Sequence, residues 1–497
     1  MQKKIGLLLL VGIGLLFAEN QVFQYGKTLK FLSRISNVDD SEIVAYMPLY
    51  HKLFAVGGNS SISVFDLTVV EKPVAIETKK LSGDASCVSV FDDLVAVSLI
   101  SENHTDPGKV VLYRYTDSLK FLKSYSVCSE PDMLTFTGNG GALLVACEGS
   151  PSDDGKINPE GAIALIQILE EDNPVSILKF DHLDSTVLIK NGVRKTGPGT
   201  FFQNLEPEYI TVDPSSKMAW VSLQENNAIG VIDLKLKKIT NVFGLGALDH
   251  SILGQGLDFK KDQQIKIENA PILGLRQPDG IAVLSENGRH YILTANEGAS
   301  RNYSSYSDET DILSLFQKGL LNPDIFNSSW LTALQKHTFS IMEPCSNGPC
   351  NHVEAFGSRS MSVFDGKTGK ILFDSGDQIE KMIAKTVPSL FNWNAKKGKL
   401  KIDARSEDKG AEPEMVTIGE WNDKKVAFLG LERMTGIIVW DLKNPEKPLI
   451  IDYYLDPKDR GPEGILFISA QKSPFPRIPL LIVGYEYSKS IVIYSIQ

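Results

Sequence analysis

The stretch SISVFDL, residues 61–67, alternates like a β-strand and has an aspartate near its end. Six further copies of this pattern follow: KVVLYRY at 109–115, AIALIQI at 162–168, AIGVIDL at 228–234, SMSVFDG at 360–366, GIIVWDL at 436–442 and SIVIYSI at 490–496. Regular repetition of a short strand pattern is typical of folds built from many small sheets.

A second strand pattern follows each of the first six copies, as in PVAIET at 73–78 and KILFD at 370–374. Nothing follows the seventh copy, but TLKFLS at 28–33 closely matches SLKFLK at 118–123. We expect residues 28–33 to complete the last sheet, because closing a ring removes exposed sheet edges. The sequence thus predicts an all-β, seven-bladed β-propeller closed by this N-terminal strand, with an open β-solenoid or two β-sandwiches as alternatives.

The chain has 497 residues, more than seven blades of roughly 40–45 residues require. We assign the excess to loop insertions near residues 244–276, 298–359 and 373–411, with short helices at 311–318 and 329–336. With 42% hydrophobic and 23% charged residues the composition is globular, and the net charge of -10 excludes a basic nucleic-acid-binding surface.

The N-terminus has the pattern of an export signal. Lys3 and Lys4 precede an apolar run at 5–17, shorter than the roughly 20 residues of a membrane helix, and Ala18 suits cleavage. We therefore expect a signal peptide at 1–18 and a mature domain at 19–497, with an uncleaved signal anchor as the alternative. No second apolar stretch of spanning length follows. The expected product is a monomer that is periplasmic, secreted or at the cell surface.

Export permits disulfides, and the chain has 5 cysteines. Cys345 and Cys350 flank a turn-forming Ser-Asn-Gly-Pro stretch and form the expected pair. The spacing of Cys87, Cys128 and Cys147 leaves their pairing open.

Acidic residues recur in step with the strands. One set follows a proline or serine at the start of six of the seven first strands, the second blade with Ala85-Ser86-Cys87 being the exception: Glu42, Asp132, Glu208, Asp279, Glu414 and Glu463. Another ends the second strands: Glu148, Glu225, Glu297, Glu432 and Glu486. Antiparallel neighbours place both sets at the same end of a sheet, so we expect them around one mouth of a central channel.

Clustered carboxylates raise one another's pKa unless something compensates their charge. Oxygen ligands favour Ca²⁺ or Mg²⁺ over Zn²⁺. The predicted cation ligands are Glu208, Asp279, Glu414, Glu463, Glu225, Glu297 and Glu432. The alternative is that each carboxylate accepts hydrogen bonds from nearby backbone or pairs with a base.

The three insertions are expected on the acidic face, where long loops usually mark the functional face of a rigid scaffold. They place further polar groups near the acids, and the predicted ligand-binding residues are Arg359, Arg405, Arg433, Arg460, Asp249 and His250. Ion pairs that neutralise one another are the alternative interpretation of these residues.

Several long motifs resemble the choice-of-anchor I family, also labelled mesenchyme-specific cell surface glycoprotein-like. They include NLEPEYITV at 204–212, QPDGIAV at 277–283, DARSEDKGAEPEMVTIG at 403–419, GLERMTGIIVWDL at 430–442 and DRGPEGILFI at 459–468. The resemblance implies an exported propeller, in some members labelled alkaline phosphatase, with similarity to phytase-like propellers. Many members carry a C-terminal anchoring module, which has no counterpart after the last strand here.

Two functions remain open. The first is a binding or adhesion propeller whose cation-holding mouth recognises an extracytoplasmic small molecule, a glycan or an envelope protein. The second is a metal-dependent phosphoester hydrolase, in which clustered carboxylates hold cations that activate water. Arg405, Arg433 or Arg460 would then neutralise developing charge.

Overall fold

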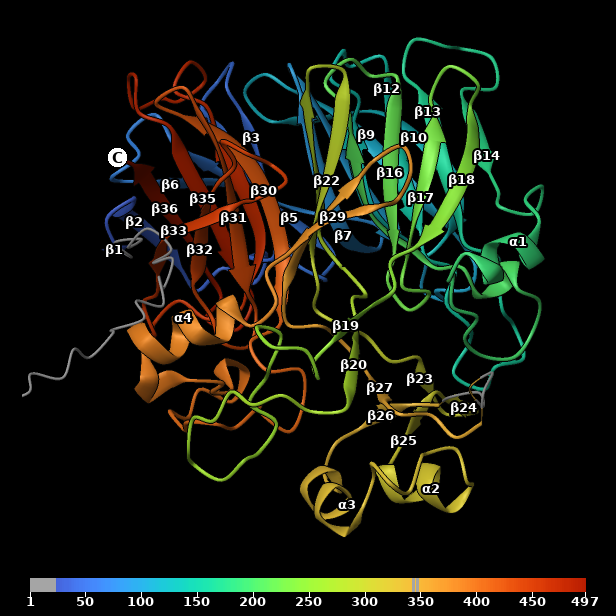
Figure 1. Cartoon of the computed structure of the whole chain (residues 1–497). Helices are drawn as coiled ribbons and strands as arrows, with labels where there is room; N and C mark the ends of the chain where they lie inside the picture. The colour runs from blue at the N-terminus through green and yellow to red at the C-terminus, as the bar shows by residue number, and fades with distance from the viewer. Residues whose placement is uncertain (1–23, 342–344, 346–347) are drawn as a thin grey trace, which may run out of the picture.

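The structure is a computed structural model that describes residues 24–341, 345 and 348–497, so the predicted signal peptide at 1–18 lies outside the described residues. Short strands dominate, and the few helices lie outside the main sheets (Figure 1). The fold is all-β, and its four-stranded antiparallel units fit a β-propeller. None of the helices in the described part is long and apolar enough to cross a bilayer.

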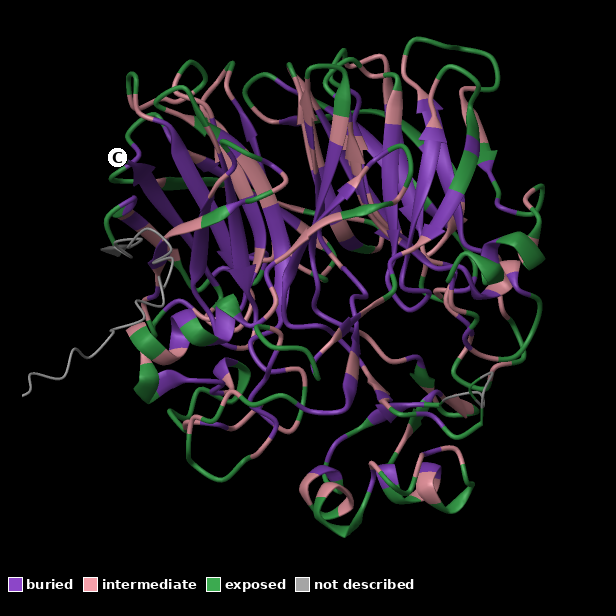
Figure 2. Ribbon diagram, in the orientation of Figure 1, coloured by how far each residue is buried: buried purple, intermediate pink, exposed green. Residues whose placement is uncertain are grey.

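The repeated pattern forms the third strand of each sheet, as in β5 (Ser61–Asp66), whose central residues are all buried. Such strands are apolar on both faces because neighbouring sheets cover them on each side. The outermost strands differ: β6 (Val74–Lys80) has mostly exposed or half-buried residues. Figure 2 shows this gradient, with buried strands inside and exposed loops at the ends.

The sheets share one order, in which consecutive strands pair antiparallel. The first three are β3 (Ile43–Met47), β4 (Lys52–Val56), β5 and β6; β7 (Asp84–Phe91), β8 (Leu94–Ile100), β9 (Pro107–Tyr115) and β10 (Leu119–Ser129); and β11 (Pro131–Phe136), β12 (Ala142–Cys147), β13 (Ala162–Gln167) and β14 (Val175–Leu178). The next two are β15 (Pro207–Val212), β16 (Met218–Leu223), β17 (Ala228–Asp233) and β18 (Lys238–Gly244); and β21 (Ile281–Glu286), β22 (Arg289–Ala295), β28 (Met361–Asp365) and β29 (Ile371–Asp374).

The last two sheets recruit N-terminal strands. One contains β30 (Pro413–Trp421), β31 (Lys424–Leu431), β32 (Ile437–Asp441) and β33 (Leu449–Tyr454), with β1 (Gln24–Tyr25) added in parallel to β33. The other contains β34 (Pro462–Ile468), β35 (Leu480–Tyr485) and β36 (Ser490–Ile496). Its fourth strand is β2 (Leu29–Ser36), which pairs antiparallel with β36 and sets Leu29 opposite Ile496.

The first strands of successive sheets contact one another in chain order, from β3 through β7, β11, β15, β21 and β30 to β34. Strand β34 also contacts β3. Apolar clusters fill the spaces between neighbouring sheets; one joins residues of β3–β5 to residues of β35 and β36.

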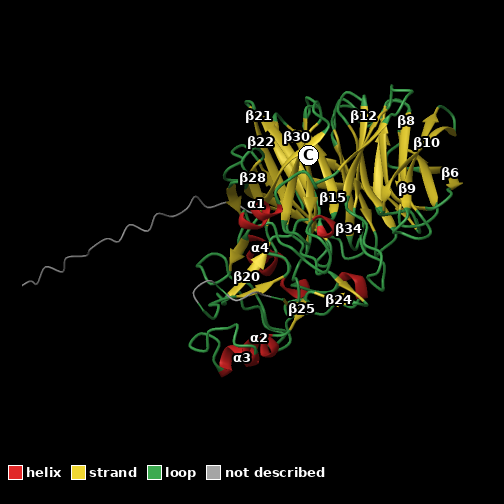
Figure 3. Cartoon of the chain, turned by 90° about the vertical axis from the view of Figure 1, so that its right-hand side faces the viewer, coloured by secondary structure: helices red, strands yellow, loops and turns green. Residues whose placement is uncertain are grey.

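Insertions lie on one side of the sheets (Figures 1 and 3). The segments between β18 and β21 and between β22 and β28 contain β19 (Ala247–Asp249), β20 (Ile272–Leu275), β23 (Asn302–Tyr303), β24 (Tyr306–Ser307), β25 (Glu309–Thr310), β26 (Phe339–Ser340) and β27 (Val353–Ala355). They also contain α2 (Ile312–Gln317) and α3 (Ser328–Leu334), where the sequence predicts short helices, and share a small apolar core. Helix α4 (Gln378–Thr386) lies between β29 and β30, and α1 (Ser185–Lys190) between β14 and β15.

Strand β2 offers a direct test of how firmly the N-terminal strand is packed. Leu29 is 1% exposed, whereas Phe31 on the same strand is 41% exposed. We expect Leu29→Ala to lower the free energy of unfolding by about 2–5 kcal/mol, because it leaves a cavity in a packed core. Phe31→Ala is the matched control and should cost clearly less. Denaturant unfolding measures both, and equal losses would contradict the packing described.

Candidate functional site

The Pro-acid motif produces a β-bulge at the start of the first strands. In β11 the register shifts by one residue between Pro131 and Leu134, and the same shift follows Pro207, Pro413 and Pro462. Proline suits this first position because it needs no ladder donor, and a bulge redirects the side chain beside it. The acids in these bulges are Asp132, Glu208, Glu414 and Glu463.

Backbone contacts bring acids of neighbouring sheets together. The N–H of Gly464 donates to the carbonyl of Glu42 at 3.0 Å, and the N–H of Gly280 donates to that of Glu414, also at 3.0 Å. A Cβ at Gly464 would overlap the Glu42 carbonyl, so the approach requires glycine. Glu463 and Glu42, like Asp279 and Glu414, therefore sit in directly adjoining segments.

We call the six first-strand acids, Glu42, Asp132, Glu208, Asp279, Glu414 and Glu463, the inner acids. Burial and the charge of Glu486 raise the pKa of Glu42 to about 7. Burial and the charge of Glu130 raise the pKa of Asp132 to about 6, and burial with Glu297 raises that of Asp279 to about 7.

The other inner acids respond to several sheets at once. Burial raises the pKa of Glu208 well above its usual value, and the charges of Glu225, Asp279 and Glu148 add to the shift. For Glu463, burial acts together with Asp279, Glu432, Glu486 and Glu42. Carboxylates from the second strands thus lie near those of the first strands, and the structure brings the predicted cation ligands into one region.

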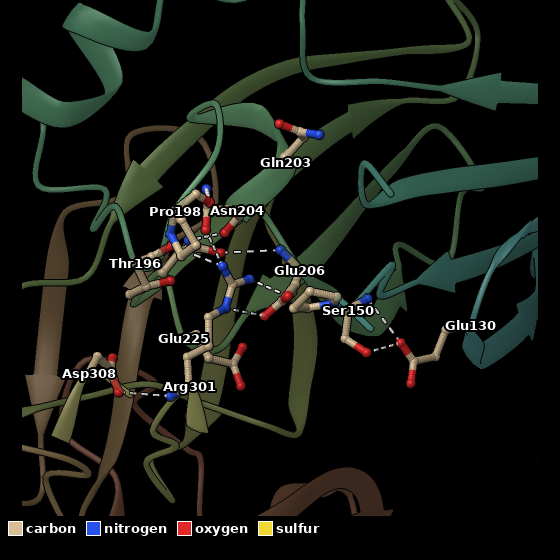
Figure 4. Close-up of polar contacts among 12 residues, drawn as sticks. Glu130, Ser150, Thr196, Pro198, Gln203, Asn204, Glu206, Glu225, Arg301 and Asp308 are labelled. Carbon is tan, nitrogen blue, oxygen red and sulfur yellow. Dashed lines mark hydrogen bonds and ion pairs between the residues drawn. The ribbon is translucent and has the colours of Figure 1, made fainter. Parts of the chain in front are cut away.

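A glutamate that is not among the predicted site residues precedes the proline in three of the Pro-acid motifs, and its environment differs from that of the inner acids. We call Glu130, Glu206 and Glu412 the outer acids. Arg301 donates to Glu206 through Nε at 3.1 Å and also contacts Thr196 and Asn204, while Ser150 donates to Glu130 (Figure 4). The Glu-Pro-Glu repeat at 206–208 and 412–414 was the available signal for this alternation.

Glu412 is the most strongly paired outer acid. Arg405 contacts its Oε1, while Arg433 Nε and Lys409 Nζ lie 3.3 and 3.1 Å from its Oε2. Although burial opposes ionisation, these three charges lower the pKa of Glu412 to about 2. For Glu206, burial and Glu225 outweigh Arg301, and the pKa rises to about 8.

No salt bridge within the described residues reaches an inner acid, in contrast to the outer acids Glu206 and Glu412. The inner acid Glu414 is 6% exposed and its Oε2 has no hydrogen-bond partner; the same holds for Oε2 of the second-strand acid Glu225, which is 9% exposed. Buried carboxylate oxygens without donors are costly, so the inner acids carry uncompensated negative charge or bind protons.

Two trios of carboxylates have ligand atoms within 4.8 Å of one another: Asp279, Glu297 and Glu414, and Glu297, Glu412 and Glu432. Arg433 Nε lies 3.2 Å from Glu432, and Lys409 contacts Glu297 and Glu412, so bases already neutralise the second trio. In the first trio, only Glu297 contacts one of these bases. The carboxylate oxygens of the first trio, including the Glu414 Oε2 that lacks a hydrogen-bond partner, suit a hard divalent cation as ligands.

The predicted ligand-binding residues have protein partners. Arg359 Nη1 donates to Glu380 at 2.7 Å and to the Asp258 carbonyl at 2.8 Å, and Arg460 donates to the carbonyls of Ala395 and Tyr487. Arg405 and Arg433 pair with Glu412. Arg359, Arg405 and Arg433 thus form ion pairs, which is the alternative interpretation, and Arg460 binds backbone carbonyls.

Asp249 and His250 occupy the first insertion. Asp249 accepts from Ser251, and His250 Nδ1 lies 2.6 Å from the Gln255 carbonyl. Burial lowers the pKa of His250 to about 4, so it is neutral at physiological pH. His250 lines a cavity of about 270 Å³ together with Arg359 and Arg405; Asp249, Arg433 and Arg460 are not part of its lining.

The structure joins Cys345 to Cys350 and Cys128 to Cys147, and Cys87 is a buried free thiol. Cys128 is the penultimate residue of β10 and Cys147 ends β12, so this bridge links two neighbouring sheets next to Glu148.

Residues 42–445 match the family model described as the choice-of-anchor I domain, so the chain belongs to that family, as its motifs indicated. The mesenchyme-specific cell surface glycoprotein of Strongylocentrotus purpuratus is 29% identical over 287 residues, 50% of this chain and 36% of that protein. Gigasin-3a of Magallana gigas is 29% identical over 102 residues, 20% of this chain and 36% of that protein. The chain therefore spans only about a third of these relatives.

Solved structures align at low identity. Hydrazine synthase of Kuenenia stuttgartiensis covers 92% of this chain and 96% of its own, with a TM-score of 0.47 and 11% identity. The Cps50 (Swd1) β-propeller domain of Myceliophteria thermophila covers 93% and 100%, with a TM-score of 0.46 and 10% identity.

The raised pKa values predict how stability depends on pH when divalent cations are removed. The folded state holds protons on Asp132, Glu42 and Asp279 that the unfolded chain releases, since their folded pKa values are about 6, 7 and 7. The free energy of unfolding should therefore fall as pH rises from about 4 through about 7. We expect the melting temperature in chelator to drop by several degrees between pH 5 and 8. Asp279→Asn should flatten the profile, and a melting temperature that rises over this range would contradict it.

Proposed function

We propose that this chain is an exported β-propeller of the cell surface whose acidic mouth binds a divalent cation, Ca²⁺ or Mg²⁺, and recognises an extracytoplasmic ligand. The observation that carries the proposal is the contrast between the paired outer acids and the unpaired inner acids. A cation supplies the positive charge that no salt bridge among the described residues provides at Asp279 and Glu414.

The proposal includes seven blades closed into a ring by β2. The four-stranded sheets, the contacts from β3 round to β34 and back to β3, and the pairing of β2 with β36 support it. Such closure places the starts of all first strands around one axis, which accounts for the mutual influence of Glu463 and Glu42.

Several features support the proposed location. The relative from Strongylocentrotus purpuratus is named a cell surface glycoprotein, and two disulfides suit an oxidising compartment. The export signal proposed at 1–18 agrees with both. A monomer with one-sided insertions presents a broad face to a small molecule, a glycan or an envelope protein.

The geometry favours binding over phosphoester hydrolysis. A hydrolase needs positive groups free to neutralise a phosphate, in addition to its metal. Arg405 and Arg433 instead pair with Glu412, and Arg460 donates to two carbonyls. Within the described chain, the arginines predicted for this role thus already have partners.

Calorimetric titration of chelator-treated, desalted protein with CaCl₂ and MgCl₂ tests the cation site. We expect saturable binding, and Glu414→Gln should weaken it at least about tenfold because it removes a ligand charge. Glu432→Gln should weaken it less, since Arg433 neutralises Glu432. Glu160→Gln, the same charge change at a residue paired with Lys179, is the control.

Absence of saturable binding to both ions, or equal weakening by Glu160→Gln and Glu414→Gln, would overturn the cation proposal. A parallel assay with a generic phosphate monoester, run with Ca²⁺, Mg²⁺, Mn²⁺ and Zn²⁺, separates the alternative. Turnover that disappears with chelator and in Glu414→Gln would favour the hydrolase.

A further inference from the structure

A cavity of about 600 Å³ lies among the first strands, and Asp279 is the one member of the first carboxylate trio in its lining. Its lining includes four inner acids: Glu42, Asp132, Asp279 and Glu463. Further along the strands the lining becomes apolar, with Ile43, Val88, Met133, Leu134, Met415 and Ile465. One end of the cavity is therefore negative and its wall is hydrophobic, and its volume is in the range of small-molecule sites.

A second hollow of about 290 Å³ continues the cavity. The two share Met133, Thr135, Tyr209 and Thr417 in their linings. The second hollow also reaches Val212 and Asp213, at the far end of β15. Together they follow the first strands for most of their length, about 20 Å for six residues, which suits an elongated ligand.

Tyr209 sits where the two hollows meet and is half-buried. It lines the larger cavity together with two inner acids, Asp132 and Asp279, and burial raises the pKa of its phenol. An aromatic ring beside carboxylates is a favourable environment for an organic ammonium group, through cation–π and ionic attraction.

The charge of the cavity restricts what it can hold. The four inner acids in its lining form no salt bridge with the described bases, and the buried Oε2 of the neighbouring Glu414 has no hydrogen-bond partner. Anions are repelled, and a neutral ligand leaves these acids either ionised without a counter-charge or protonated. One metal ion at Asp279, Glu297 and Glu414 leaves Glu42, Asp132 and Glu463 without a counter-charge and the apolar wall uncovered.

We propose that the channel binds an elongated organic cation, an aliphatic chain carrying two or more primary ammonium groups. Its ammonium groups contact Glu42, Asp132 and Glu463, and its methylene groups cover Met133, Tyr209 and Leu134. This inference names the ligand class of the proposed binding function and rests on that proposal, but it does not require the metal.

Spermidine, a free polyamine, is the probe. Calorimetric titration of the full chain, in chelator and at fixed ionic strength, should show saturable binding that 1,6-diaminohexane reproduces more weakly and 1-hexanol does not reproduce. Glu463→Gln should lower the affinity for spermidine at least about tenfold, because it removes a charged contact in a partly desolvated site. Tyr209→Leu should lower the same affinity severalfold, because the cation–π attraction is lost.

Glu286→Gln is the matched control, since it makes the same charge change on β21 but outside both hollows. Circular dichroism establishes that each variant is folded, and Tyr209→Leu keeps the test open if Glu463→Gln is not. Equal affinities in Glu463→Gln, Tyr209→Leu and Glu286→Gln would overturn the inference, as would absence of saturable binding.

The design separates this inference from the cation proposal. Loss of Ca²⁺ binding in Glu414→Gln with spermidine binding retained supports two distinct ligands. Ca²⁺ binding without spermidine binding overturns only the polyamine inference. A lysine-rich peptide is a further arm: if it binds more tightly than spermidine and responds to the same variants, the ligand is a protein side chain and the free polyamine is excluded.

Discussion

The uncompensated negative charge at the starts of the first strands is the constraint on which the rest of the site depends. The first strands of successive sheets contact one another, and this packing brings their starts together. The Pro-acid bulges place a carboxylate at four of these starts. Like charges in a partly desolvated space repel, so the region is stable only with bound protons, fixed bases or external cations. The structure shows raised pKa values and arginines around the outer acids, and the proposed cation at Asp279, Glu297 and Glu414 would supply the third.

The proline separates two kinds of acid within three residues. Glu412 precedes Pro413 and meets Arg405, Arg433 and Lys409, whereas Glu414 follows it and meets other carboxylates. Glu206 and Glu208 divide in the same way, with Arg301 on the first. The insertions supply three of these four bases: Arg301 comes from the segment between β22 and β28, and Arg405 and Lys409 come from that between β29 and β30. The insertions therefore supply bases to the outer acids Glu206 and Glu412, whereas no salt bridge of the described residues reaches an inner acid.

Much of the architecture was predictable because each sheet is built from local signals. The SISVFDL-type repeats became third strands, and the match between residues 28–33 and 118–123 pointed to the pairing of β2 with β36. The recurring position of the acids likewise predicted their gathering, because antiparallel pairing fixes which strand ends share a side. The roles of the arginines were not predictable, since whether Arg359 meets a ligand or Glu380 depends on how an insertion folds back.

The sequence by itself determined the strand repeat, the family and the identity of the acids, because periodicity and motif order are written along the chain. Only the tertiary structure decided which acids are paired. Glu297 meets Lys409, more than a hundred residues away, and Cys128 bonds Cys147 across two sheets, while Cys87 stays free. Such contacts follow from packing between distant segments, and electrostatic energy depends on distance and burial in space rather than on separation in sequence.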